Sequence, residues 1–302
     1  MIMSTRKLWP LLALLTAGAL TSGSTLAAEV SNTAESPEIV ISAGRKGGGY
    51  WGIAERLQQV ATESGMKVEI LASVGSIENL NRLADPKNPV NLTLSQTDAL
   101  QRYIKQNPDF VHQYKIVESI GLECVFIISD AKGDVQSDQD LQDPKGHRIA
   151  IPGEQSGVAV TFDYMSNLVP GLSNTKPVYT DTLEAMKKMR TGDEDAVDAI
   201  MLVHRPKVRS PEIHLVLDKP SIYNLVPVED RHLLDELPNG ESVYEFLDVP
   251  LIRGGLTAGK SVPTICTKGL LLGSQNKLSG AARTELKRII DFQWMRIYPT
   301  NL

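Results

Sequence analysis

A strand, a glycine-containing turn and an amphipathic helix follow one another twice in this chain. The first copy reads IVISAGRKGGGYWGIAERL at residues 39–57, and the second reads RIAIPGEQSGVAVTFDYM at residues 148–165. After the first turn, apolar residues recur at helical spacing, at Tyr50, Ile53, Ala54, Leu57, Val60 and Ala61. Because a strand that feeds a helix through a short turn is the unit of a parallel sheet, this feature predicts an α/β fold.

Further strands and helices alternate around these two copies. The sequence predicts strands at KVEILAS (67–73), VNLTLSQ (90–96), PVYTDT (177–182) and AVDAIMLV (196–203), and helices at GSIENLNRLAD (75–85), TDALQRYIKQ (97–106) and TLEAMKKMRTGD (182–193). A final helix is expected from about Ser279 to Ile297. Two open sheets can then face one another across a ligand cleft. We expect two lobes, residues 29–118 plus 220–302 and residues 119–219.

The N-terminus has the pattern of a secretory signal peptide. Arg6 and Lys7 precede an apolar run from Leu8 to Leu20, and small residues follow in TSGSTLAAE. The pattern predicts cleavage after Ala27 or Ala28, so residues 1–28 would be removed. The apolar run is shorter than the ~20 residues that a membrane-spanning helix needs. We therefore expect an exported, soluble protein. The signal does not separate a bacterial periplasm from eukaryotic secretion, and we interpret it as periplasmic.

Charge and cysteine content exclude some functions. Without the leader, 29 basic residues remain against 36 acidic ones, since two of the 31 Lys and Arg residues are lost, and the net charge moves from -5 to -7. Such a balance predicts no attraction for nucleic acid or an anionic membrane. Cys124 and Cys266 each lie in an apolar, strand-like run close to where the chain would cross between lobes. Two buried thiols and a disulfide are both compatible with this pattern, and neither cysteine has metal-ligand spacing.

The glycines of the first turn allow two interpretations. Gly47, Gly49 and Gly52 spell G-x-G-x-x-G, and Glu69 lies near the place of a ribose-binding acid in a dinucleotide fold. However, bulky Tyr50 and the adjacent tryptophan interrupt the fingerprint, Glu69 falls inside its strand, and export does not suit a diffusible nicotinamide. A helix N-terminus binds carboxylates as well as phosphates. We favour a carboxylate-binding turn and expect no cofactor.

Several segments together resemble a known family. SAGRKGGGYWGIAERL, ASVGSIENLNRL, LTLSQTDAL, IAIPGEQSGVAV and TLEAMKKMRTGDEDAVDAIML, in this order and spacing, resemble the TAXI family of solute receptors for TRAP transporters, over roughly residues 38–275. The resemblance implies a two-lobed periplasmic-binding-protein fold, type II-like, with the ligand cleft between the lobes. It also implies a monomer that delivers a small anionic solute, such as glutamate, a related amino acid or a dicarboxylate, to the membrane permease subunits of a TRAP transporter.

The chain departs from the family pattern in three places. Arg45 and Lys46 occupy a loop that is commonly rich in Gly and Thr, HRPKVRSPE follows the last strand of the second lobe, and the chain ends soon after its last helix. These departures concern the ligand and the permease more than the fold.

The candidate ligand-binding residues lie at helix starts and strand ends. They are Gly44, Arg45, Lys46, Gly47, Gly48, Gly49, Tyr50 and Trp51 in the first turn, Ser73 and Ser76 before the second helix, Gln96 and Thr97 after the third strand, Gln155, Ser156 and Gly157 in the facing turn, and His204 after AIMLV. Each also has a simpler interpretation: a tight turn for the glycines, solvated charges for Arg45 and Lys46, helix capping for the two serines and a surface position for His204.

An enzyme is the alternative from another class. The serine of the facing turn falls one place after the position that G-x-S-x-G requires, and the five histidines show no H-x-x-x-H or H-E-x-x-H spacing. No nucleophile and base stand at motif spacing, so we expect no catalysis and no metal. A third possibility keeps the fold but changes the output, so that the protein senses a ligand for a membrane sensor or another class of transporter.

Overall fold

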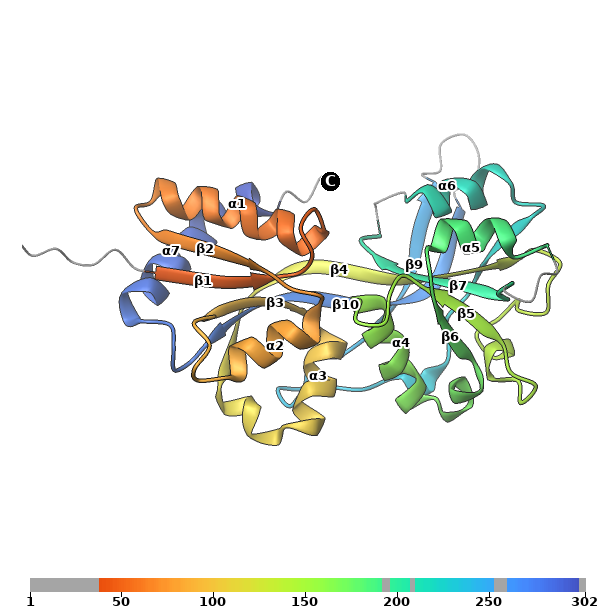
Figure 1. The fold of residues 1–302 in the computed structure, drawn as a ribbon, viewed down its shortest axis with the longest axis horizontal. Coiled ribbons are helices and arrows are strands. Elements are labelled where there is room, and N and C mark those ends of the chain that lie inside the picture. The colour runs from red at the N-terminus through yellow and green to blue at the C-terminus, as the bar shows by residue number, and fades with distance from the viewer. Residues whose placement is uncertain (1–37, 192–195, 207–209, 253–259, 299–302) are drawn as a thin grey trace, which may run out of the picture. The chain divides into compact units, whose positions relative to one another are not determined.

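The computed structural model describes residues 38–191, 196–206, 210–252 and 260–298, which belong to the compact unit Ser36–Leu302 (Figure 1). The expected signal peptide, residues 1–28, lies outside the described residues. Among the described helices, none combines the length and the hydropathy needed to cross a membrane.

The first lobe is built from three strand–helix units at the start of the chain. Its elements are β1 (Glu38–Ala43), α1 (Gly49–Glu63), β2 (Lys67–Ala72), α2 (Ser76–Ala84), β3 (Leu92–Gln96), α3 (Thr97–Gln106) and the 3-10 helix η1 (Pro108–His112). β1 pairs in parallel with both β2 and β3. Helix α1 and the last helix, α7 (Gly280–Ile297), pack on one face of these strands, and α2 and α3 pack on the other.

The second lobe repeats this arrangement. Its elements are η2 (Asp140–Gln142), β5 (Arg148–Ile151), α4 (Gly157–Leu168), η3 (Pro170–Asn174), β6 (Lys176–Tyr179), α5 (Thr182–Lys188), β7 (Ala199–His204), α6 (Pro211–Asp218), β8 (Tyr223–Val226), η4 (Arg231–Leu233) and β9 (Glu245–Ile252). β5 pairs in parallel with β6 and β7. Helix α4 packs on one face of these strands, and α5 and α6 pack on the other.

Two long antiparallel strands, β4 (Tyr114–Asp130) and β10 (Lys260–Ser274), run through both lobes. In the first lobe β10 pairs with β3, and in the second lobe β4 pairs with β7 and β8 while β10 pairs with β9. The described strands thus form one ten-stranded sheet, ordered β2-β1-β3-β10-β4-β7-β5-β6 along its main path. The α/β, two-lobed fold is confirmed. The prediction of two separate sheets is wrong, because β4 and β10 carry the hydrogen-bond ladder from one glycine turn to the other.

The chain returns to the first lobe within β10. The sequence division assigned residues 220–302 to the first lobe, but the structure pairs β8 and β9 with the second-lobe parts of β4 and β10. Apolar side chains of β8, β9 and the first part of β10 also fill the two apolar clusters of the second lobe. The end of β10 and α7 belong to the first lobe, since β10 changes its partner from β9 to β3 between Cys266 and Gly269. The segment before β9 also contacts the first lobe, because Leu237 lies in one of its apolar clusters and Asp235 forms an ion pair with Lys105.

Helices α3 and α4 make a second contact between the lobes. Asp98 is fully buried in the first turn of α3, and its carboxylate accepts hydrogen bonds from Thr161 Oγ1 at 2.7 Å and Tyr244 Oη at 3.1 Å. Burial raises the pKa of this carboxyl group above its ordinary value. Arg102 of α3 and Asp163 of α4 form an ion pair at 3.0 Å. These bonds hold α3 and α4 side by side.

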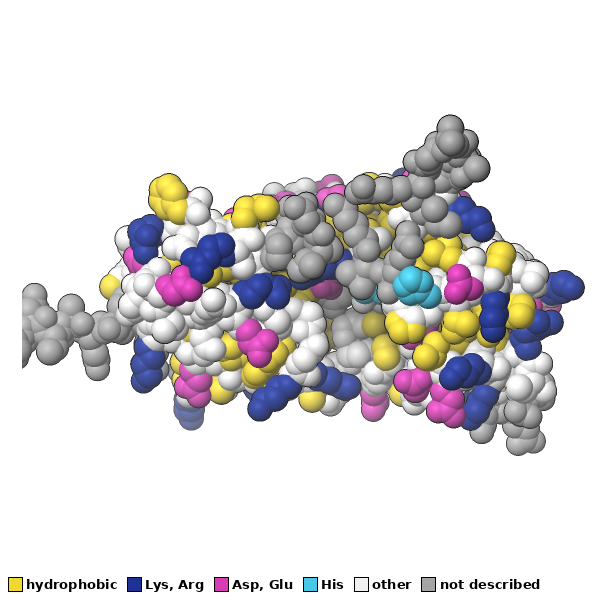
Figure 2. All heavy atoms as spheres, turned by 90° about the horizontal axis from the view of Figure 1, so that it is seen from above, with side chains coloured by type: hydrophobic (Ala, Val, Ile, Leu, Met, Phe, Trp, Pro, Cys, Tyr) yellow, Lys and Arg dark blue, Asp and Glu magenta, His cyan; other side chains and the backbone are white. Residues whose placement is uncertain are grey.

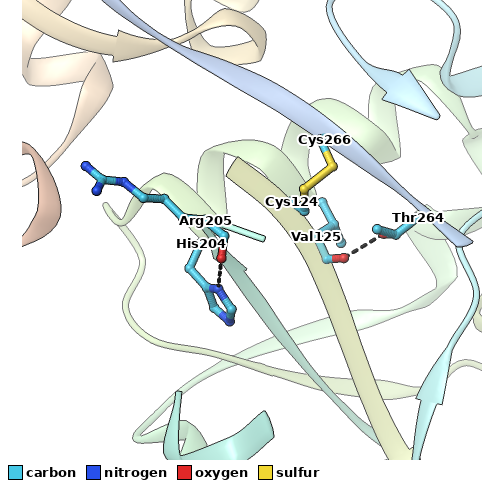
Figure 3. Close-up of a disulfide and its surroundings, with 6 residues drawn as sticks. All are labelled: Cys124, Val125, His204, Arg205, Thr264 and Cys266. Atoms are coloured by element: carbon cyan, nitrogen blue, oxygen red, sulfur yellow. Dashed lines mark hydrogen bonds between the residues drawn. A yellow bond between two sulfur atoms is a disulfide. The ribbon is translucent and has the colours of Figure 1, made fainter. Parts of the chain in front are cut away.

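The two cysteines form a disulfide where β4 and β10 pass from one lobe to the other (Figure 3). Cys124 and Cys266 are direct partners in the antiparallel ladder, and both are buried. Close by, Thr264 Oγ1 of β10 donates a hydrogen bond to the carbonyl oxygen of Val125 of β4 at 2.6 Å. Of the two arrangements that the sequence left open, the structure therefore has the disulfide.

Removing this disulfide should destabilise the protein, because the bridge joins residues 142 positions apart and so restricts the unfolded chain. We expect the double variant Cys124→Ala, Cys266→Ala to lose about 2–5 kcal/mol of unfolding free energy in urea titrations. Dithiothreitol should destabilise the wild type to the same extent and leave the double variant unchanged. Two reactive thiols in the unfolded, unreduced wild type would show that the bridge does not form.

Candidate functional site

A cavity of about 560 Å³ lies between the two lobes. The turn after β1, the loop before α2 and the end of β3 form its wall in the first lobe. The start of α4 and the end of β7 form its wall in the second lobe, and Glu123 of the crossing strand β4 lies between them. The carboxyl ends of parallel strands and the helices that follow them thus meet here, as expected for a ligand site in an α/β fold.

Four of the described helices begin at this cavity: α1, α2, α3 and α4. Their N-cap residues are Gly48, Gly75, Gln96 and Ser156. Ser156 caps its own helix by accepting a hydrogen bond from the backbone N–H of Ala159 at 3.1 Å, whereas the other three helix starts have no side-chain cap. A helix start has unpaired N–H groups and a partial positive charge, so this convergence favours a negatively charged ligand.

The turn before α1 has glycine where its backbone needs it. The N–H of Gly48 donates to the carbonyl oxygen of Arg45 at 2.9 Å and closes a four-residue turn. Gly47, the third residue of this turn, has a φ of 79°, a left-handed conformation that side chains disfavour. The Arg45 side chain reaches the facing turn of the second lobe, where its Nη2 lies 3.4 Å from the place that a Cβ on Gly153 would take.

Three guanidinium groups among the described residues line the cavity, those of Arg45, Arg56 and Arg205. Arg56 Nε donates to the carbonyl oxygen of Ile297 at 2.6 Å, and Arg205 lies over the ring of Tyr298 at 4.4 Å. On the face shown in Figure 2, basic and acidic side chains are interspersed over both lobes. The cavity is therefore more basic than that outer face.

Glu123 is the acidic group of the cavity, and Tyr50 Oη donates to its Oε2 at 3.2 Å. Burial is the main cause that raises the pKa of Glu123 to about 7, and the nearby carboxylate of Asp98 adds to the rise. Tyr50, Arg205 and Gln96 oppose it. Burial also raises the pKa of Tyr50, so the phenol remains the donor of this pair. The carboxyl group can consequently gain or lose a proton near neutral pH.

Two further polar side chains at the cavity have an unsatisfied atom. Gln96 is buried, and its Oε1 has no hydrogen-bond partner among the described residues. His204 Nδ1 lies 2.9 Å from the carbonyl oxygen of Arg205, which can only accept, so Nδ1 carries the proton (Figure 3). The His204 ring stacks on Phe126, and burial lowers its pKa, so the ring is neutral and its Nε2 is an acceptor without a partner.

The structure brings most of the candidate residues from the sequence to this one cavity. Those that line it are Gly44, Arg45, Gly47, Gly48, Gly49, Tyr50, Ser76, Gln96, Ser156, Gly157 and His204. The candidates that do not line it are Lys46, Trp51, Ser73, Thr97 and Gln155. Of the adjacent aromatic pair, therefore, Tyr50 faces the cavity and Trp51 does not.

Three of the candidates outside the cavity, Lys46, Trp51 and Thr97, have other side-chain contacts. Trp51 Nε1 donates to Glu55 Oε1 at 2.6 Å, and the Lys46 ammonium lies 5.7 Å from the centre of the Trp51 ring. Thr97 Oγ1 donates to the carbonyl oxygen of Lys268 on β10 at 3.0 Å. Ser73 is buried and precedes the helix start, where Gly75 is the N-cap. Helix capping by Ser73 or Ser76, the simpler interpretation, is therefore wrong for α2.

The predicted set lacks three charged residues of the cavity wall, Arg56, Glu123 and Arg205. Glu123 is an acid inside the apolar part of β4, directly before Cys124, and this interruption of the pattern was a usable signal. Arg56 follows Gly52 by one helical turn, so it lies on the same face of α1. The remaining additions to the predicted set are Gly52, Val74, Gly75, Val158 and Val203.

Glycines allow the lobes to approach one another beside the cavity. A Cβ on Gly75 would overlap the carbonyl oxygen of Gln155 in the facing turn, and a Cβ on Gly157 would overlap Oε1 of Gln96. Both contacts join a helix start of one lobe to a helix start of the other. The distance between the lobes at this place thus depends on the absence of two side chains.

Neither a protein-family model nor a curated protein matches the chain. Distant likenesses are found among solved structures. XAC2383 from Xanthomonas citri bound to ATP is 11% identical over 84% of this chain and 82% of that chain, with a TM-score of 0.47. A periplasmic transporter is 11% identical over 87% and 86%, with a TM-score of 0.49. The periplasmic VFT2 domain of BvgS from Bordetella pertussis is 11% identical over 85% and 88%, with a TM-score of 0.44.

Replacing Gly75 by alanine should push the lobes apart, because the new Cβ would overlap the backbone of Gln155. Any residue can adopt the φ of Gly75, 162°, so the expected effect comes from steric overlap and not from backbone strain. We expect a loss of about 1–3 kcal/mol of unfolding free energy and faster amide exchange in the first turn of α4. Gly280→Ala, where nothing lies within 4 Å of the new Cβ, is the matched control. Equal stability and exchange in both variants would contradict the contact.

Replacing Glu123 by glutamine should remove a pH dependence of stability. The pKa of Glu123 is raised from 4.5 to about 7 in the folded protein, so its stabilising contribution is complete below pH 4.5 and is lost as the pH rises through 7. Between pH 5 and 8 we expect the wild type to lose about 2–3 kcal/mol of unfolding free energy relative to Glu123→Gln. Urea titrations across this range measure it, with Glu118→Gln on the same strand as control. Parallel pH profiles of the wild type and Glu123→Gln would refute the assignment.

Proposed function

We propose that this chain is an exported solute-binding protein that holds a small carboxylate-bearing solute between its two lobes. The observation that carries the proposal is the convergence of four helix starts and three guanidinium groups on one cavity that both lobes form. A cavity of about 560 Å³ suits a ligand of amino-acid or dicarboxylate size, since small-molecule sites span ~300–1,000 Å³.

The anionic character of the ligand follows from the donors. The N–H groups at the uncapped starts of α1 and α2 can pair with carboxylate oxygens without supplying a full countercharge, whereas at the start of α3 the N–H groups of Asp98 and Ala99 already donate to side-chain oxygens. Arg45 adds a full charge, and its guanidinium group extends from the first lobe to the facing turn of the second lobe at Gly153. Its fork of donors matches the two oxygens of a carboxylate. Glu123 accepts a proton near neutral pH, which limits its repulsion of an anion.

The destination of the solute is proposed from the family resemblance. Like a TAXI-family receptor, the protein would work in the periplasm as a monomer, without catalysis, and pass a solute such as glutamate or a dicarboxylate to a TRAP-type membrane transporter. The signal-peptide pattern at residues 1–28 supports export, and the quoted glycine-turn segments support the family.

Arg45→Ala should weaken binding of the acidic solute by about 1.5–3 kcal/mol, the range for hydrogen bonds to charged groups, and leave the fold intact. A thermal-shift screen of amino acids and dicarboxylates would identify the solute, and calorimetry would then compare the wild type with the variant. Lys46→Ala removes the same charge one residue away, from a side chain outside the cavity, and should bind as the wild type does. If no carboxylate binds the wild type, or if the two variants bind alike, the proposed site is wrong.

A further inference from the structure

Arg205 is held over the cavity by an aromatic ring from the other lobe. It follows β7 of the second lobe, whereas Tyr298 follows α7 of the first lobe. The Arg205 guanidinium carbon lies 4.4 Å from the centre of the Tyr298 ring, the geometry of a cation–π contact. Figure 3 shows the Arg205 side chain extending away from both the His204 ring and the disulfide.

Tyr298 is itself fixed in place. Its ring stacks on Trp294 with centroids 6.1 Å apart, and its hydroxyl packs against the bare backbone of Gly121 on the crossing strand β4. Gly121 has a φ of 89° and space for no side chain on this side, so β4 leaves room for the ring. The hydrogen bond from Arg56 Nε to the carbonyl oxygen of Ile297 holds the residue immediately before Tyr298.

The contact opposes a repulsion inside the cavity. Arg205 and Arg56 carry like charges, and after burial the field of Arg205 is the second cause that lowers the pKa of Arg56. The Glu123 carboxyl group attracts Arg205 only in its ionised form, so near neutral pH the Arg205 side chain needs a further partner to stay close to Arg56. The negative face of the Tyr298 ring supplies that partner without neutralising the charge, because a ring carries no net charge of its own.

We propose that Tyr298 is a positioning residue, which keeps the Arg205 guanidinium over the cavity as part of the anion-binding site. This inference rests on the proposed function, since it assigns a role within the same site. Arg205 and Tyr298 belong to different lobes, so the site has all its charges in place only when the lobes are together. Tyr298 acts through Arg205 and contacts no solute itself.

Titration of Glu123 tests the proposal without any ligand. The groups that act on Glu123 are Tyr50 of α1, Gln96 at the end of β3, Asp98 of α3 and Arg205, and the positive charge of Arg205 lowers the Glu123 pKa. Side-chain carbon NMR should therefore show a higher Glu123 pKa in Arg205→Gln and in Tyr298→Leu. In the double variant the Glu123 pKa should rise no further than in Arg205→Gln. In Tyr298→Phe, which keeps the ring, the Glu123 pKa should equal that of the wild type.

Calorimetry with L-glutamate, or with the solute that the screen selects, tests the consequence for binding. Tyr298→Leu and Arg205→Gln should each weaken binding by about three- to tenfold. The two losses should not be additive in the double variant, and Tyr298→Phe should have wild-type affinity. In the wild type, the Arg205 Hδ protons should show an upfield ring-current shift, which needs no variant to fold.

The outcomes separate the two proposals. If the wild type binds no carboxylate, the proposed function is wrong. If the same protein still shows the ring-current shift and the coupled Glu123 titration, Tyr298 nevertheless positions Arg205. An unshifted Arg205 resonance, or a Glu123 titration that Tyr298→Leu does not change, overturns the positioning role. Additive losses of affinity in the double variant would overturn it as well, since they would mean that the two residues act independently.

Discussion

The antiparallel pairing of β4 with β10 is the interaction on which both lobes depend. The two strands share one ladder from Ser274 and Tyr114 to Cys266 and Cys124, and beyond the disulfide each continues with partners of the second lobe. The ladder is irregular between Lys268 and Leu270, where the strands leave the first lobe. The same crossing carries Glu123, so the central acid of the cavity is fixed by the element that joins the lobes.

The second constraint is the contact of the lobes at their helix starts. Gly75 and Gly157 permit backbone and side chain to meet there, and the buried bonds of Asp98 join α3 to α4 and to Tyr244. A buried carboxylate needs these donors, because an unpaired charge in this position would be costly. The arrangement that brings the lobes together therefore also brings the helix starts, with their partial positive charges, to the cavity.

Local structure was largely predictable from the sequence. The last helix begins after the expected Ser279, which caps it by accepting from the N–H of Ala282, and the turn from Gly44 to Gly49 forms the cavity wall. Adjacent helical residues point about 100° apart, so one of Tyr50 and Trp51 had to leave the cavity, but the sequence did not show which. The roles of Arg56, Glu123 and Tyr298 were not predictable, because each depends on a partner that is distant in the chain.

The sequence by itself determined the repeated strand, turn and helix, the need for glycine at Gly47 and the positions where helices begin, because backbone conformation and first-turn hydrogen bonds depend on near neighbours. Only the tertiary structure decided that the two sheets become one, that β8 and β9 join the second lobe, and that Cys124 meets Cys266. It also decided the protonation range of Glu123 and the place of Arg205 over Tyr298. These features depend on burial and on contacts between different elements of the fold, and no local pattern encodes them.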